Sequence, residues 1–219
     1  MIAGELISQN VMPLRTSDTG DTALGLMGDY YIKHLPIVNN SELLGILSED
    51  DILNNDVEEA VGSYRLSLRN VYVRDFDHIY EAYKLFNLHH LTALPVIDHE
   101  NNYKGMILME DVVKVVAATF SITEPGGILV LEMSRRDYSL AEMSKIVESE
   151  NANILSSYIS PTADSNIVQV TLKINKPNLQ SIIATFQRYK YLVRASYQET
   201  EYMDALKERY DSLMTYLEV

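Results

Sequence analysis

Three residues with the types and spacing of a ligand site follow one another closely in the chain: Gly45, Ser48 and Asp51. A carboxylate accepts two hydroxyl hydrogen bonds at once, which suits a sugar diol, and a hydroxyl group can bind a sugar or phosphate oxygen. The two polar residues lie where an apolar run gives way to acidic residues, a pattern that begins a helix. Ser48 and Asp51 therefore have two open interpretations, as ligand contacts or as the cap and first-turn charge of a helix.

An internal repeat places this pattern twice in the first half of the chain. Residues 33–38 (KHLPIV) align with residues 92–97 (TALPVI) at an offset of 59. Asp51 aligns with Asp111 at an offset of 60, because the turn of the second copy is one residue longer. The matches keep the same order with one length change in a turn, which indicates a duplicated unit of about 60 residues.

Each copy has the pattern of helix, strand, strand, helix. Apolar residues at helical spacing precede two short apolar strands, and acidic residues begin the second helix, where they complement its dipole. A single unit would expose an apolar sheet face, so two units are expected to pack together. We expect these elements at residues 18–31, 35–38, 43–47 and from 48 onward in the first copy, and at 77–88, 94–97, 103–108 and 109–120 in the second.

These residues resemble the CBS domain pair, also called a Bateman module, over residues 1–120. The most specific feature is Leu-Pro-(Ile/Val)-(Val/Ile), a turn, and then Gly-x-x-(Ser/Thr)-x-x-Asp. The resemblance implies clefts that bind adenosine-containing ligands such as AMP, ADP, ATP or S-adenosylmethionine. It further implies that the Asp binds the ribose, the Ser or Thr binds ribose or phosphate oxygens, and apolar residues beside the Pro enclose the adenine.

In the first copy the resemblance implies one complete site, with Lys33 and His34 near phosphate and Thr16 near the base. Its implied residues are Thr16, Lys33, His34, Pro36, Ser48 and Asp51. In the second copy Leu108 replaces the hydroxyl residue and cannot hydrogen-bond to a ligand. A weaker second site is therefore expected at Ala93, Pro95 and Asp111.

The repeat ends near residues 123–127 (TEPGG), whose Pro and Gly residues mark a boundary. The following residues predict strand, helix, strand, strand, helix, strand, the order of a ferredoxin-like βαββαβ unit. The strand pattern is clearest at residues 167–174, where apolar and polar residues alternate. We expect an α/β (α+β) protein with repeats at 1–60 and 61–124, a second domain at 125–198 and a C-terminal helix at 199–219.

Residues 127–197 resemble an ACT domain, a module that often binds amino acids where copies meet. Ser139 stands where the ligand sites of that family have glycine, which favours a packing or oligomerising role. Ser139 and Glu142 predict a capping box at the first helix of this domain. Residues 201–219 predict an amphipathic helix that docks on its own CBS pair or on a partner subunit. Its apolar residues are Met203, Leu206, Tyr210, Leu213 and Leu217.

Composition narrows the partners and the location. The net charge is −13, from 18 basic and 31 acidic residues, and −11 of it falls in residues 1–124. This charge opposes binding to nucleic acid or to an anionic membrane surface. The chain has no Cys, which excludes disulfides and thiolate sites and favours a reducing, cytoplasmic location. Neither a signal peptide nor a membrane span is predicted.

No metal site and no catalytic group is expected. His89 and His90 are adjacent and would diverge on a helix, and no nucleophile or phosphate-loop motif is present. The predicted function is a non-catalytic regulator, with no required cofactor, that senses an adenosine nucleotide or S-adenosylmethionine through its CBS pair. This layout is similar to that of the acetoin utilisation protein B family. The alternative is a ligand-free oligomerisation protein that docks on a client enzyme, and a homodimer is expected in either case.

Overall fold

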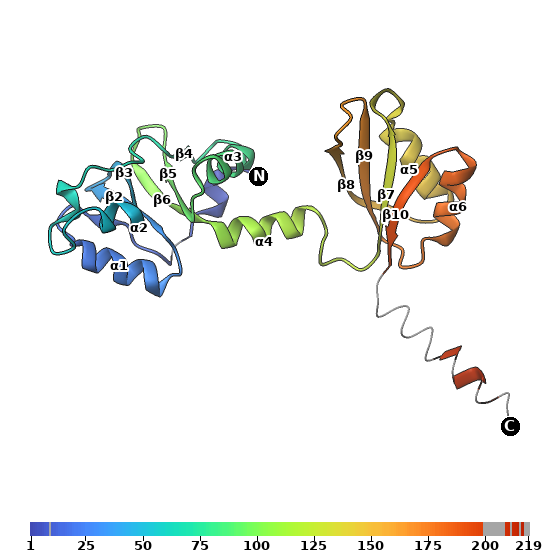
Figure 1. The fold of residues 1–219 in the computed structure, drawn as a ribbon, viewed down its shortest axis with the longest axis horizontal. Helices are drawn as coiled ribbons and strands as arrows, with labels where there is room; N and C mark the ends of the chain where they lie inside the picture. The colour runs from blue at the N-terminus through green and yellow to red at the C-terminus, as the bar shows by residue number, and fades with distance from the viewer. Residues whose placement is uncertain (9, 199–208, 211, 215, 217–219) are drawn as a thin grey trace. The chain divides into compact units, whose positions relative to one another are not determined.

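The computed structural model describes residues 1–8, 10–198, 209–210, 212–214 and 216. The chain divides into two compact units, Met1–Val115 and Val116–Val219 (Figure 1). Both units combine helices with sheets, so the predicted α+β class is confirmed. The predicted C-terminal helix lies largely outside the described residues.

The first repeat builds a small sheet of order β1-β2-β3 from the predicted strands and one short strand that the sequence pattern did not indicate. β1 pairs in parallel with β2, and β2 pairs antiparallel with β3. The second helix begins directly after β3, because Ser48 ends the strand and caps the helix. The elements are η1 (Ala3–Leu6), β1 (Leu14–Arg15), α1 (Gly20–Asp29), β2 (His34–Asn39), β3 (Glu42–Ser48) and α2 (Glu49–Leu53).

The second repeat forms a sheet of order β4-β5-β6 with the same pairing, parallel and then antiparallel. Its last helix runs on past the boundary between the two units. The elements are η2 (Val61–Ser63), β4 (Val73–Arg74), α3 (Ile79–His89), β5 (Ala93–Ile97), β6 (Tyr103–Leu108) and α4 (Met109–Thr119).

The segments that precede the two repeats are exchanged between them. The start of the chain packs on the second repeat, where Ser8 N donates to Met106 O at 2.8 Å. The segment between the repeats packs on the first, where Ile46 N donates to Leu68 O at 2.9 Å. Each sheet is therefore completed at its edge by the segment that leads into the other repeat.

A continuous apolar core joins the two repeats. Leu35, Leu47 and Ile52 of the first repeat are fully buried in the same cluster as Met106 and Leu108 of the second. Burial of apolar area of this kind is the main stabilising contribution to folding. Leu108 thus has a structural role at the position where the first repeat has Ser48.

The second unit is one antiparallel sheet of order β10-β7-β9-β8 with two helices packed on one face. Every second residue of β9 is buried against those helices, as its alternating pattern predicts: Val168, Val170, Leu172 and Ile174. The elements follow the predicted βαββαβ order: β7 (Gly127–Ser134), η3 (Arg135–Asp137), α5 (Leu140–Ser149), β8 (Ile154–Pro161), β9 (Ile167–Ile174), α6 (Gln180–Arg188) and β10 (Leu192–Tyr197).

The capping box predicted at α5 forms only in part. Ser139 Oγ accepts a hydrogen bond from Glu142 N at 3.3 Å, which caps the helix. The Glu142 carboxylate instead accepts a hydrogen bond of 2.5 Å from the Tyr191 hydroxyl, which lies just before β10. A contact across 49 residues therefore takes the place of the predicted local one.

Candidate functional site

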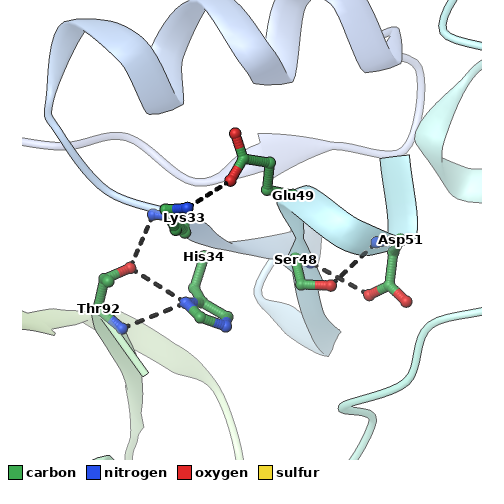
Figure 2. Close-up of polar contacts among 6 residues, drawn as sticks. All are labelled: Lys33, His34, Ser48, Glu49, Asp51 and Thr92. Carbon is green, nitrogen blue, oxygen red and sulfur yellow. Dashed lines mark hydrogen bonds and ion pairs between the residues drawn. The ribbon is translucent and has the colours of Figure 1, made fainter. Parts of the chain in front are cut away.

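Ser48 and Asp51 form a complete capping box at the start of α2. Ser48 Oγ accepts a hydrogen bond from Asp51 N at 3.0 Å, and Asp51 Oδ2 accepts one from Ser48 N at 3.1 Å (Figure 2). Asp51 Oδ1 has no hydrogen-bond partner among the described residues. The helix-cap interpretation is thus correct, and one carboxylate oxygen stays available for a ligand.

The segment that leads into the second repeat lies beside this capping box. Ser67 Oγ donates to Asp51 Oδ2 at 3.1 Å. Residues 65–71, together with His89 at the end of α3, line a hollow of about 580 Å³. Ser67 therefore connects the Asp51 carboxylate to an open space of a size that suits a small ligand.

Two arginines, Arg65 and Arg69, line this hollow and are exposed to solvent. Within the described part of the chain, neither forms an ion pair or a hydrogen bond through its guanidinium group. An arginine binds phosphate or carboxylate oxygens in bidentate geometry. Both arginines precede the aligned part of the second repeat, so the repeat pattern does not indicate them. The charge pattern is the signal that could have: they are the first basic residues after residues 35–64, which carry seven acidic residues and no Lys or Arg.

Lys33 directly precedes β2, and its side chain is engaged in an ion pair on the surface. Its Nζ forms an ion pair of 3.0 Å with Glu49 Oε2 (Figure 2), and its backbone N donates to Thr92 Oγ1 at 2.8 Å. The side chains of this pair are 69% and 40% exposed, so the pair is a weak one that a ligand could displace.

His34 links the two repeats instead of facing open solvent. Its Nδ1 accepts a hydrogen bond from Thr92 N at 3.2 Å and lies 3.1 Å from Thr92 Oγ1 (Figure 2). Burial lowers the pKa of the His34 imidazole, against the opposing effect of the Asp51 and Asp50 carboxylates. The ring is therefore neutral at pH 7, with Nδ1 as the acceptor, and supplies no positive charge for a phosphate.

Pro36 and Thr16 complete the predicted first site, and only Pro36 lies near its other members. Pro36 is buried in β2 opposite Ile46. Thr16 follows β1, which pairs with the far end of β2, and it lines a separate hollow of about 520 Å³. Arg15, next to Thr16, pairs with Val38, whereas Ser48 pairs with His34. Val38 and His34 are four residues apart along β2, a distance of about 13 Å. The structure thus does not bring Thr16 together with Ser48 and Asp51.

The residues of the predicted second site are engaged within the protein. Ala93 and Pro95 are buried in β5, and Leu108 is part of the core that both repeats share. Asp111 Oδ1 accepts a hydrogen bond of 2.8 Å from Lys114 Nζ, one turn further along α4. The carboxylate of the second copy therefore already has a cation beside it.

The described residues contain no group of three or more His, Cys, Asp or Glu side chains that could hold a metal ion. In the same part of the chain, no helix has both the length and the apolar character needed to cross a membrane.

Comparison with known proteins identifies the first unit. The CBS domain family matches residues 3–58 and 61–118, which together are more than half of the chain. The chain belongs to the CBS domain family. The match coincides with the two repeats and ends within α4, so the resemblance of residues 127–197 to an ACT domain stays a prediction.

Curated relatives and solved structures are similar to this chain over part of its length. Inosine-5'-monophosphate dehydrogenase of Bacillus subtilis is 25% identical over 187 residues, which are 78% of this chain and 37% of that enzyme. A CBS domain pair/ACT domain protein of Thermotoga maritima is 24% identical, with a TM-score of 0.49 over 54% of this chain and 98% of that one. A putative acetoin utilization protein of Vibrio cholerae is 23% identical, with a TM-score of 0.48 over 56% of this chain and 95% of that one.

Proposed function

We propose that this CBS pair is a non-catalytic sensor that binds an adenosine-containing ligand in the hollow beside Asp51. One observation carries the proposal: Ser67 hydrogen-bonds to Asp51 and also lines a hollow that contains Arg65 and Arg69. Ser67 thereby links a carboxylate that suits a ribose diol to a hollow with two cations that suit a phosphate. Membership of the CBS domain family supports the same class of ligand.

The charges near the hollow favour a phosphorylated ligand. Lys33 and His34, the predicted phosphate contacts, are engaged with Glu49 and Thr92. Without other cations this would favour a ligand of low negative charge, such as S-adenosylmethionine, because residues 1–124 carry a net charge of −11. Arg65 and Arg69 supply the missing positive charge, so AMP, ADP or ATP is the better candidate.

A ligand regulates a protein only when it binds one arrangement of that protein better than another. Residues 65–71 precede β4 of the second repeat and contact the first repeat through Ser67, so a ligand in the hollow would bind the segment that joins the two repeats. Occupancy would then stabilise one arrangement of the pair. We further propose that the protein acts in the cytoplasm as a homodimer that reports this state to a client enzyme, without a required cofactor.

Isothermal titration calorimetry with AMP, ADP, ATP and S-adenosylmethionine tests the proposal. Asp51→Asn should weaken binding about tenfold to a hundredfold, the effect of losing one hydrogen bond to a charged group. Asp111→Asn is the matched control in the second repeat and should leave binding unchanged. Arg69→Gln should weaken binding of the nucleotides more than binding of adenosine. The proposal fails if no ligand binds at millimolar concentration, or if the two Asp variants behave alike.

A ligand-free interaction protein is the second candidate. It is favoured by the complete capping box of Ser48 and Asp51, because both residues already have a structural role. In that case Asp51→Asn would change the melting temperature, but no nucleotide would alter the melting temperature of either the unmodified protein or the variant. Light scattering would show the same homodimer for the unmodified protein and for Asp51→Asn.

A further inference from the structure

A hollow of about 500 Å³ lies on the face of the second-unit sheet that is opposite α5 and α6. Its floor consists of two rows of residues that pair across neighbouring strands. One row joins Ser156 of β8, Lys173 of β9 and Ile128 of β7. The next row joins Tyr158 of β8 to Thr171 of β9. Opposite residues of paired strands have Cβ atoms about 5 Å apart, so the side chains of these rows lie next to one another above the sheet.

The residues that follow α4 form a wall of this hollow. Phe120 O accepts a hydrogen bond of 2.7 Å from Ser156 Oγ. The rings of Phe120 and Tyr158 meet edge to face, with their centroids 5.6 Å apart. Ile122, which is 62% exposed, also lines the hollow. Contacts of the backbone and of a ring hold this wall on the sheet, so the hollow is a formed feature of the second unit, and its volume is typical of a small-molecule site.

Lys173 places a positive charge among these apolar walls. Its side chain is partly buried, and Nζ donates a hydrogen bond of 3.2 Å to Gly126 O. An ammonium group has three donors, so Lys173 can also bind a second acceptor. Within the described chain no carboxylate forms an ion pair with Lys173, whereas the exposed Lys84 and Lys114 each have one. Partial burial of a charge without a counter-charge is unfavourable, and an anion bound in the hollow would offset this effect.

The described residues that line the hollow include no Asp or Glu. Glu132 lies on the same face of β7, but it is four residues from Ile128, a distance of about 13 Å along the strand. The Glu132 carboxylate accepts a hydrogen bond of 3.1 Å from Gln169 Nε2 and lies 3.9 Å from Arg194 Nε. The hollow therefore combines one cation with apolar and aromatic walls, which suits a carboxylate attached to an apolar body.

We propose that this hollow binds a small aromatic carboxylate that has no amino group beside the carboxylate. The ligand carboxylate pairs with Lys173 Nζ, and the Thr171 hydroxyl is a second donor. The ligand ring lies against Phe120 and Tyr158, because edge-to-face contacts between aromatic rings are favourable. An α-amino group would bring a second ammonium close to Lys173, and no carboxylate of the hollow could receive it, so an amino acid of the same shape binds less well. This site is independent of the ligand site in the CBS pair.

An NMR titration of the full chain, labelled at its isoleucine methyl groups, tests the ligand class and its place. Addition of 3-phenylpropanoate should shift the methyl signals of Ile122 and Ile128, which line the hollow, and leave that of Ile182, in the core on the other side of the sheet, unchanged. The amide 3-phenylpropanamide lacks the charge, and L-phenylalanine adds the amino group. Both should bind about tenfold to a hundredfold more weakly, the effect of one hydrogen bond to a charged group. Equal binding of the acid and either of these compounds, or no shift with the acid at millimolar concentration, would overturn the proposal.

Variants test the residues in the same titration. Lys173→Gln should weaken binding of 3-phenylpropanoate to the level of the amide. Lys176→Gln is the matched control and should leave binding unchanged, because Lys176 Nζ also donates to a backbone carbonyl, Glu150 O at 2.9 Å, but does not line the hollow. Thr171→Phe keeps Lys173 but fills the hollow, so it should abolish the methyl shifts. Equal effects of the two lysine variants, or shifts that persist in Thr171→Phe, contradict the proposal. The comparison of compounds needs no variant, so it tests the role of charge even if Lys173→Gln fails to fold.

Discussion

Gly45 connects the fold of the first repeat to its candidate ligand site. It lies in β3 with φ +152°, in a region that side chains rarely adopt. A Cβ atom at this position would lie 2.9 Å from Leu66 Cδ1, 3.1 Å from Leu68 O and 3.2 Å from Arg69 Cα. All three atoms belong to the segment that lines the hollow. Gly45→Ala should therefore strain the strand and push this segment away from Asp51.

The expected loss of stability has two parts. A residue held in an unfavourable backbone region costs about 1–3 kcal/mol. Displacement of the segment removes the hydrogen bond between Ile46 N and Leu68 O, which contributes about 1 kcal/mol. Gly45→Ala should thus lower the free energy of unfolding by about 2–4 kcal/mol, or the melting temperature by about 8–16 °C at roughly 4 °C per kcal/mol.

Gly25→Ala is the matched control for this variant. Gly25 lies inside α1, and a Cβ atom there would meet nothing within 4 Å. Alanine in a helix interior is favoured over glycine by up to about 1 kcal/mol, so this variant should be slightly more stable. Thermal unfolding followed by circular dichroism measures both. A melting temperature of Gly45→Ala within 2 °C of the unmodified protein, or a shift of both variants in the same direction, would contradict this prediction.

Two further predictions concern titrating groups. Burial lowers the pKa of His34 in the folded protein. As the pH falls below about 6.5, the His34 imidazole is therefore protonated in the unfolded chain before it is protonated in the folded one, and the free energy of unfolding decreases. His34→Asn keeps an acceptor for Thr92 but does not titrate, so urea unfolding should show a smaller loss of stability between pH 7 and pH 5; an equal loss would contradict this. Thr185 Oγ1 donates a hydrogen bond to the Glu150 carboxylate, and this bond is the largest of the causes that lower the pKa of Glu150. The ionised carboxylate therefore stabilises the fold at pH values above the unfolded-state pKa, and this stabilisation is lost as the pH falls through the lowered pKa of the folded state. Thr185→Val should raise the pKa of Glu150 in an NMR titration, and an unchanged pKa would contradict the assignment.

Features of this protein that depend on neighbours in the sequence could be predicted from it. The capping box joins Ser48 and Asp51, which are only three positions apart, and the alternation along β9 shows residue by residue which face is buried. The duplication is likewise visible in one dimension, because both copies keep the same order of apolar runs and turns. These signals arise from helix and strand periodicity and from helix caps, which are local properties.

The composition of the candidate site was decided by tertiary structure alone. Ser67 reaches Asp51 across 16 residues and Thr92 meets His34 across 58, while Thr16 lies at the far end of β2 from both. No periodicity records such contacts, because they arise when each repeat completes its sheet with the segment that leads into the other. The sequence by itself determined two CBS repeats and a βαββαβ unit. The exchange of segments, driven by burial of a core that both repeats share, decided which residues surround Asp51.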